Sequence, residues 1–360
     1  YVLEHSESQL VFVGSFDQAE NMNEAIPSAT PTVAMTGCSV ACDDSIAGII
    51  ETVSPFTESP KPDLDDVFTI IYTSGTTGNP KGVMHLHRTP GHVVPGLTQT
   101  FAMVDEASHL FSFLPMAHAA ERIIIEMSGI YSGSSISFSE GLATFGDEIR
   151  SVQPTFFFAV PRLWLKFKEG VDVNIPAEQQ KLLSAEQKQG ITQMLGLSKA
   201  RVILTGSAPC PRDVQDWFLD MGIHLRDAYG MTENFVHGAG WFSDETPKSG
   251  CVGQTMGGEV EVRLSEEGEI QFRSKGLMKG YYKAPEKTAE VLIDGWYHTG
   301  DLAYRDDDGF LWIAGRNDDC FKSRGIFISP IEIENALRQI NEIAEACVVP
   351  SPDKVIGNKI

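Results

Sequence analysis

The sequence lacks any apolar run of the roughly 20 residues that a membrane helix needs, so it predicts no transmembrane segment within these 360 residues. No basic stretch followed by an apolar one comes after Tyr1, and no secretion signal is expected there. The six cysteines are scattered, with neither a Cys-x-x-Cys pair nor histidines at zinc-binding spacing. This pattern favours reduced thiols and a cytoplasmic location.

Positive charge is also scarce. Lysine and arginine number 28 against 49 acidic residues, which gives a net charge of −21. Between Tyr1 and Asp66, twelve acids face a single base, Lys61. Because nucleic acids and anionic lipids repel such a surface, neither is expected as a partner. With 42% apolar and 21% charged residues, the chain is typical of soluble globular proteins and long enough for two or three domains.

Apolar runs typical of strands alternate with segments typical of helices, which predicts a parallel sheet covered by helices. The predicted strands are 67–72, 109–114, 135–139, 154–160, 201–204 and 223–227, and the predicted helices are 121–132, 142–152 and 211–221. Short β runs at 259–264 and 268–273 indicate a β-rich part. A polar linker at 315–324, a helix from Ser329 and a strand at 344–349 follow.

We therefore expect four parts: an α/β subdomain over 1–106, a second over 107–245, a β-rich subdomain over 246–316, and a hinge with the start of another domain over 317–360. The first residues resemble the end of a helix. The last 40 or so residues are too few for an independent domain, and both ends are expected to continue in a longer protein.

A loop rich in glycine and hydroxyl groups follows the strand predicted at 67–72. Glycine lets the backbone approach an anion, while hydroxyls and lysine supply donors and charge for phosphate oxygens. The loop is not a P-loop, because the Gly-Lys-Ser/Thr ending is absent, and a simple surface turn is the alternative. The candidate phosphate-binding residues are Thr73, Ser74, Gly75, Thr76, Thr77, Gly78 and Lys81.

Three further segments follow the loop in order: Asp227-Ala-Tyr-Gly-Met-Thr-Glu233, Tyr297-His-Thr-Gly-Asp301 and Gly315-Arg-Asn-Asp-Asp319. Together with the loop, they resemble the adenylate-forming (AMP-binding) acyl-CoA synthetase superfamily. The resemblance implies an α/β fold with two parallel-sheet subdomains, a small β-barrel-like subdomain and the start of a small mobile α+β C-terminal domain.

Other segments resemble particular groups within that superfamily. Residues 114–118, 153–164 and 205–210 are similar to long-chain fatty acid–CoA ligases, whereas 315–334 is closer to aryl-CoA ligases such as the benzoate type. The resemblance implies an ATP-dependent ligase that forms an acyl-AMP with release of pyrophosphate and then an acyl-CoA thioester. Its cofactors and co-substrates would be ATP, Mg²⁺ and coenzyme A, with a fatty acid or another carboxylic acid as substrate.

The resemblance also implies roles for individual residues. Glu233 would bind Mg²⁺, Thr232 the α-phosphate, and Lys81 the outer phosphates. Asp301 and Arg316 would bind the ribose, and Asp318 would be the hinge. The adenine slot and its surroundings would comprise Gly206, Ser207, Ala208, Asp227, Ala228, Tyr229, Gly230 and Met231.

Each assignment has a structural alternative. Glu233 could cap a helix, Asp301 could lie in a turn, and Arg316 could form a surface ion pair. His118 is either a buried structural histidine or a catalytic residue beside the acyl group. The aromatic run at 156–158, with Val160 and Trp164, lines an acyl tunnel or simply fills a core.

The sequence is also compatible with three other functions: an aryl-CoA ligase, a non-catalytic nucleotide-binding fragment, or an adenylation domain that serves a carrier protein. Peripheral membrane contact is also open. The C-terminal catalytic lysine of the superfamily is not matched by Lys322 or Lys359. The 360-residue chain is therefore expected to adenylate its substrate slowly.

Overall fold

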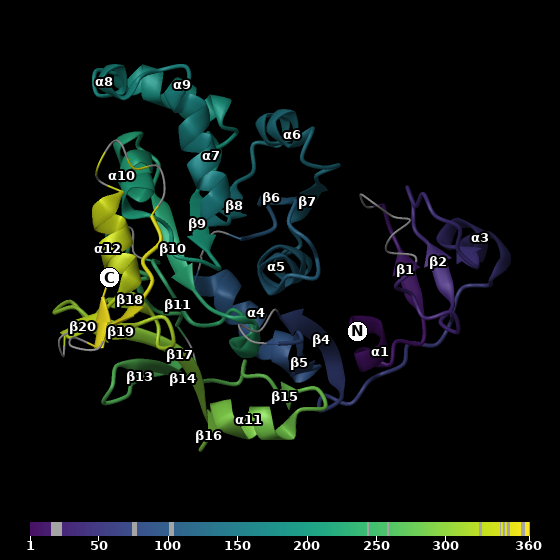
Figure 1. Cartoon of the computed structure of the whole chain (residues 1–360). Helices are drawn as coiled ribbons and strands as arrows, with labels where there is room; N and C mark the ends of the chain where they lie inside the picture. The colour runs from purple at the N-terminus through teal and green to yellow at the C-terminus, as the bar shows by residue number, and fades with distance from the viewer. Residues whose placement is uncertain are drawn as a thin grey trace. The chain divides into compact units, whose positions relative to one another are not determined.

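The structure is a computed structural model (Figure 1). It describes residues 1–15, 24–73, 78–100, 104–242, 245–257, 259–323, 326–338, 340, 343, 346–353 and 357–359. The chain divides into two compact units, one made of 1–66 with 72–82 and the other of 67–71 with 83–360. Each unit is considered by itself below.

The first unit contains a small parallel sheet. Helix α1 (Val2–Ser6) precedes strands β1 (Val11–Val13), β2 (Thr32–Ala34) and β3 (Asp44–Ser45), which pair in that order, and helix α3 (Ile46–Thr52) follows. Ser45 caps α3, since its hydroxyl accepts a hydrogen bond from the amide of Gly48 at 3.1 Å. The last residues of β4 (Val67–Thr73) and the first of β5 (Lys81–Leu86) also belong to this unit.

The second unit is built on a seven-stranded sheet in the order β12-β11-β10-β9-β8-β6-β7. Five of these strands are parallel, and β11 and β12 continue the sheet antiparallel. Their bounds are β6 His109–Ser112, β7 Ser135–Phe138, β8 Phe156–Ala159, β9 Val202–Gly206, β10 Leu225–Tyr229, β11 Ala239–Gly240 and β12 Gln254–Thr255.

Helices cover this sheet, and Figure 1 shows α7 and α10 running beside β8, β9 and β10. The helices are α4 (Arg88–Thr100), the π-helix η1 (Glu121–Met127), α5 (Ser128–Ser132), α6 (Phe145–Val152), α7 (Pro161–Asp172), α8 (Ala177–Gln180), α9 (Ala185–Met194), α10 (Arg212–Asp220) and the short 3₁₀-helix η2 (Thr232–Asn234). The alternation of strand and helix is the parallel α/β arrangement that the sequence predicts.

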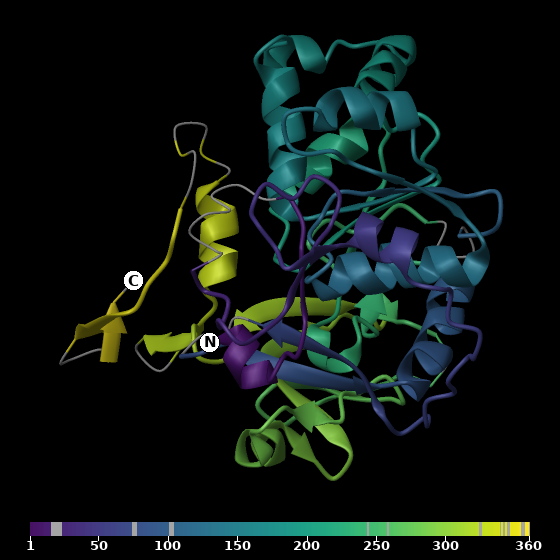
Figure 2. The ribbon, with the colours of Figure 1, turned by 90° about the vertical axis from the view of Figure 1, so that its right-hand side faces the viewer.

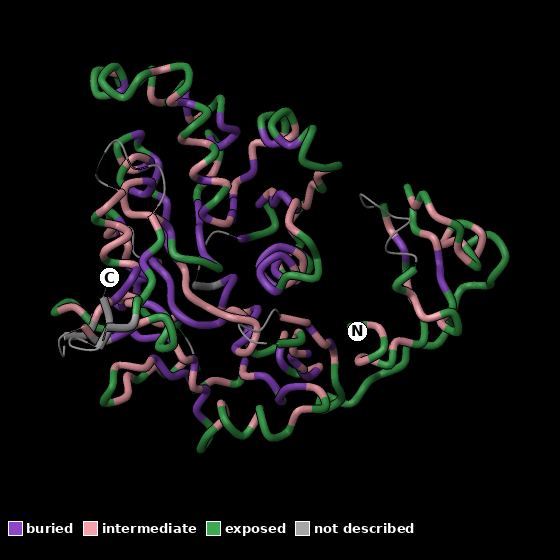
Figure 3. The backbone as a smooth tube through the Cα atoms, viewed as in Figure 1, coloured by how far each residue is buried: buried purple, intermediate pink, exposed green. Residues whose placement is uncertain are grey.

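Both faces of the sheet are buried, as the tube in Figure 3 shows for β8 and β9. Along β8, Phe156 and Phe158 join one apolar cluster and Phe157 joins the other, because successive side chains of a strand point to opposite faces. Trp164 belongs to the second cluster, and its indole nitrogen donates to the carbonyl of Ala159 at 3.0 Å. These aromatic side chains are core residues, the structural alternative to an acyl tunnel.

A second sheet forms the predicted β-rich part, seen in green and yellow-green at the lower end of Figure 2. Its antiparallel strands are ordered β13-β14-β17-β16, and β18 also pairs with β17. Their bounds are β13 Glu261–Leu264, β14 Glu269–Arg273, β16 Leu292–Ile293, β17 Trp296–Arg305 and β18 Leu311–Arg316. Strand β15 (Gly280–Tyr281) instead pairs with β5, and helix α11 (Pro285–Val291) follows it.

The remaining elements are β19 (Phe321–Ser323), β20 (Ile326–Ile328), α12 (Pro330–Leu337), β21 (Ser351–Asp353) and β22 (Gly357–Lys359). Helix α12 begins with Pro330 in its first turn, as predicted. Two sequence predictions are wrong in detail. The polar stretch 315–324 is partly strand, because β18 and β19 extend into it. The described part of 344–349, residues 346–349, is not a strand.

The predicted helix at 121–132 is also divided, since a π-helix precedes α5. The α/β fold itself, with parallel-sheet subdomains, is confirmed. The domain boundaries stay predictions, although β12 lies beyond the boundary expected at 245 and still pairs with β11. Within the described residues, no helix combines the length and apolar character needed to cross a membrane.

Candidate active site

The carboxyl ends of β9 and β10 bring two predicted segments together. Ala228 of β10 lies beside Gly206 of β9 in the parallel register. A Cβ atom at Gly206 would lie 2.7 Å from the Ala228 carbonyl oxygen, so only glycine fits. Ser207 follows in the left-handed conformation, with φ of 68°. The chain therefore turns sharply at this edge, where ligands of parallel α/β sheets generally bind.

Asp301 on β17 faces the end of β10. Its Oδ2 accepts a hydrogen bond from the hydroxyl of Tyr229 at 2.5 Å, and its Oδ1 lies 2.9 Å from Nε of Arg316 on β18. The aspartate is buried, whereas half of the Arg316 side chain is exposed. Burial raises the pKa of Asp301, although the phenol and the guanidinium oppose this effect. A buried carboxylate with two donors already in place can accept hydrogen bonds from a polar ligand such as a ribose.

The turn that carries Asp301 is fixed by β14. Gly300 has φ of 72°, and its amide donates to Oε1 of Glu269 at 2.9 Å. The hydroxyl of Thr299 donates to the carbonyl of Ile270 at 2.7 Å, and it accepts from the amide of Asp301 at 3.0 Å. Side chains of the sheet thus set the direction of the Asp301 carboxylate.

Glu233 lies in η2, directly after β10, and is held at both its side chain and its backbone. Its Oε1 accepts a hydrogen bond from the hydroxyl of Tyr281 at 2.8 Å, and its carbonyl accepts from the amide of Met278 at 2.8 Å. Nε2 of the buried His85 donates to the carbonyl of the preceding Thr232 at 2.7 Å. Burial lowers the pKa of His85 to about 4, so its ring stays neutral in this role.

A single carboxylate such as Glu233 is a suitable ligand for Mg²⁺ only when other oxygens complete the shell. The described residues contain no cluster of three or more acidic, histidine or cysteine side chains able to hold a metal. Mg²⁺ is commonly bound by one or two carboxylates together with phosphate oxygens and water. Glu233 therefore fits a cation that arrives with a nucleotide rather than one held by the protein alone.

Asp227 lies on β10, two positions before Tyr229. It is buried against α10, where Nε2 of Gln215 donates to its Oδ2 at 3.1 Å. Burial raises its pKa to about 7.

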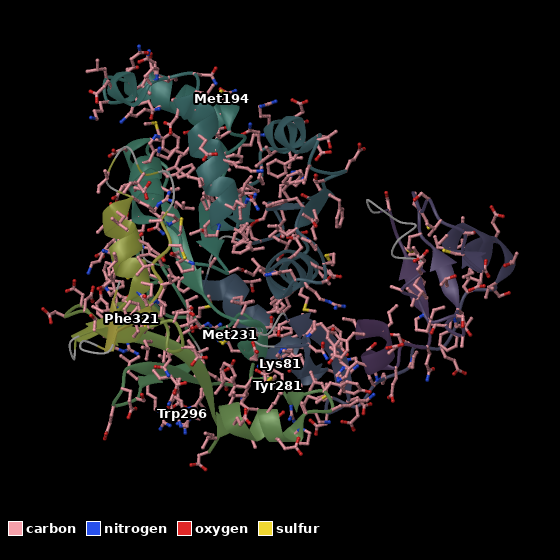
Figure 4. The ribbon with its side chains drawn as sticks, viewed as in Figure 1. Lys81, Met194, Met231, Tyr281, Trp296 and Phe321 are labelled. Atoms are coloured by element: carbon pink, nitrogen blue, oxygen red, sulfur yellow. The ribbon has the colours of Figure 1, made fainter. Side chains whose placement is uncertain are left out.

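The side chain of Met231 packs in the apolar cluster that contains Tyr281 and Tyr297. Figure 4 labels Met231 and Tyr281. The amide of Met231 donates to Oδ1 of Asn234, so Gly230 and Met231 form the tight entry to η2.

The predicted phosphate loop belongs to the first unit. Thr73 ends β4, Gly78 has φ of 110°, and Lys81 begins β5. Residues Ser74, Gly75, Thr76 and Thr77 lie outside the described residues. In the same unit, the hydroxyl of Tyr1 donates to the carbonyl of Pro80 at 3.3 Å, close to the end of the loop.

Two further candidates lie on exposed turns. Asp318 occupies the turn between β18 and β19, where the amides of Asp319 and Cys320 donate to the carbonyl of Arg316. His118 is exposed just before η1, and its Nδ1 accepts from the amide of Ala120 at 3.3 Å. The buried structural role considered for His118 is therefore wrong.

Comparisons with known proteins identify the family of the chain. The AMP-binding enzyme family matches residues 1–282. The chain belongs to this family. It is 30% identical over 337 residues to long chain acyl-CoA synthetase 3 of Arabidopsis thaliana. This alignment covers 79% of this chain and 50% of that protein. It is also 30% identical, over 352 residues, to the malonate–CoA ligase of the same plant. That alignment covers 92% of this chain and 54% of the ligase.

The solved structure of ATP-bound MatB from Rhodopseudomonas palustris has the same fold, with a TM-score of 0.79 at 23% identity over 99% of this chain and 69% of that one. This AMP-binding family member spans about half the length of the curated relatives it matches.

Three residues of the site were not identified from the sequence. His85, Tyr281 and Glu269 stand in no motif of their own. Each forms a hydrogen bond with a residue that is distant in the sequence. His85 and Thr232, for example, are 147 positions apart. The local sequence shows only that Tyr281 and Glu269 each follow a glycine.

Proposed function

We propose that this protein is an ATP-dependent fatty acid–CoA ligase that joins a medium- or long-chain carboxylate to coenzyme A. The main support is the pairing of Asp301 with Tyr229 and Arg316 at the carboxyl edge of a parallel sheet. Tyr229 ends β10, and Glu233 follows it in the short helix η2. Membership of the AMP-binding family and the similarity to a long chain acyl-CoA synthetase favour the same conclusion.

In the proposed first step, the carboxylate attacks the α-phosphorus of ATP, an acyl-AMP forms, and pyrophosphate leaves. Negative charge gathers between the carboxylate and the triphosphate, so cations and donors must be in place beforehand. The loop from Thr73 to Gly78, with Lys81, would hold the outer phosphates, and Thr232 would contact the α-phosphate. Mg²⁺, bound by Glu233 and phosphate oxygens, would supply the compensating charge.

The nucleoside would bind beside β9 and β10. Asp301 would accept hydrogen bonds from the ribose hydroxyls, and Arg316 would stay paired with its carboxylate. Tyr229 and the backbone of 206–208 would form the adenine slot. In the second step, the thiol of coenzyme A attacks the acyl carbon and AMP leaves; a turn of the chain about Asp318 would accompany this change, as hinges of a single residue allow.

The substrate class has a specific alternative. Residues 315–334 are closer to aryl-CoA ligases, and one relative is a malonate–CoA ligase. An aromatic or short polar acid would then replace the fatty acid. The scattered, unpaired cysteines support a reducing location such as the cytoplasm.

Pyrophosphate release with palmitate, decanoate, benzoate and malonate tests the proposal. We expect the two fatty acids to stimulate release and to compete with each other, with Glu233→Gln as the inactive control. Stimulation by benzoate or malonate alone would overturn the fatty acid assignment. If no acid stimulates release but ATP raises the melting temperature, the chain binds nucleotide without turning it over.

A further inference from the structure

The buried Tyr281 forms a hydrogen bond with Glu233. Its hydroxyl donates to Oε1 of Glu233 at 2.8 Å, and Tyr297 packs in the same buried cluster. A phenol carries one proton, so the direction of this bond is fixed when the carboxylate accepts. Both rings are 4% exposed, and burial together with the neighbouring carboxylate raises the pKa of both hydroxyls.

Tyr281 is itself held rigidly. It lies on β15, paired with Val83 of β5, and its amide donates to Oγ1 of Thr288 on α11 at 2.9 Å. The preceding Gly280 packs so closely that a Cβ atom there would lie 2.8 Å from Thr288. A hydroxyl fixed in this way loses little freedom when it binds, so it can orient a carboxylate strongly.

The backbone of Glu233 is fixed as well, through the amide of Met278 three residues before Tyr281. One short segment, Met278–Tyr281, therefore contacts Glu233 at its carbonyl and at Oε1. Within the described residues, no donor reaches Oε2. This oxygen is the one that remains for a cation.

Resting on the proposed function, we propose that Tyr281 is a positioning residue that orients Glu233 toward the divalent cation of the bound nucleotide. Such residues form a hydrogen bond with a metal ligand without touching the metal. Their removal typically lowers metal affinity by about 10- to 100-fold. A tyrosine that only fills the core would instead change stability and leave the metal dependence alone.

The test compares Tyr281→Phe with Tyr282→Phe. The first variant keeps the ring and removes only the hydroxyl. The second is a matched control on the next residue, whose ring lies 5.1 Å from the ammonium of Lys283 rather than at Glu233. Mn²⁺ binding in the presence of ATP, measured by electron paramagnetic resonance, reports cation affinity without turnover. The Mg²⁺ dependence of pyrophosphate release reports the same property in the working enzyme.

We expect Tyr281→Phe to weaken Mn²⁺ binding and to raise the half-saturating Mg²⁺ concentration by roughly 10-fold or more, with near-normal turnover at saturating Mg²⁺. Tyr282→Phe should leave both properties unchanged. Adding Tyr281→Phe to Glu233→Gln should cause no further loss, because both act through one group.

A folded Tyr281→Phe protein with wild-type Mn²⁺ affinity and Mg²⁺ dependence would overturn the inference. That result would leave the proposed function intact, provided that the wild-type protein binds Mn²⁺ with ATP. If Glu233→Gln binds Mn²⁺ as tightly as the wild type, the proposed metal role of Glu233 fails instead, and with it the basis for the inference.

Discussion

Replacing Asp301 with asparagine probes the ribose contact most directly. The aspartate is buried, and both of its carboxylate oxygens already have donors, Tyr229 at 2.5 Å and Arg316 at 2.9 Å. An asparagine keeps one carbonyl oxygen but loses the charge and one acceptor. Hydrogen bonds to charged groups contribute about 1.5–3 kcal/mol each, so we expect ATP affinity to fall by about 10- to 100-fold.

The stability of the fold should change far less. Half of the Arg316 side chain is exposed, so the lost ion pair is screened by solvent and contributes at most about 1 kcal/mol. Calorimetric titration with ATP and urea unfolding measure the two quantities separately. Asp307→Asn, in the exposed turn between β17 and β18, is the matched control and should leave both unchanged. ATP binding within twofold of wild type in a folded Asp301→Asn protein would refute the reasoning.

Two further variants test the buried polar groups and the close approach of strands. Burial raises the pKa of Glu121 to about 7, so the folded state retains a proton that the unfolded chain releases, and stability falls as pH rises from about 4.5 to 7. Glu121→Gln should remove up to about 3 kcal/mol of that fall, as measured by urea unfolding at pH 5 and pH 8; curves parallel to those of the wild type would contradict this. Gly206→Ala should cost about 1–3 kcal/mol and weaken ATP binding, because its methyl group meets the Ala228 carbonyl. Gly190→Ala, where the added Cβ meets nothing within 4 Å, is its control, and equal stability of the two variants would count against the steric argument.

Much of the fold could be predicted from the sequence because strand and helix patterns are local. The run Phe156–Phe158, for example, predicts a strand buried on both faces, and β8 is such a strand. The same pattern could not distinguish a core from an acyl tunnel, since both need aromatic side chains in the same order. Nor could it show that a π-helix begins at Glu121, because the apolar spacing suits an ordinary helix as well.

The candidate site could be predicted only where a motif lies within a few residues. Asp301 and Glu233 stand in such motifs, and their roles remain predictions. Tyr281 and Glu269 gain their place from tertiary contacts, a hydroxyl 48 positions from its carboxylate and a carboxylate 31 positions from an amide. No local pattern encodes pairs so distant, because they depend on how the sheets pair.

Strand β17 carries two residues with separate tasks: Tyr297 packs in the cluster that contains Tyr281, and Asp301 accepts a hydrogen bond from Tyr229. They are four positions apart on one strand that is paired on both sides, so a shift of the strand displaces both together. Under the proposed function, occupation of the ribose end and occupation of the cation end become thermodynamically linked. Such linkage is reciprocal: a nucleotide that orders β17 raises the affinity for the cation by the same factor as the cation raises that for the nucleotide.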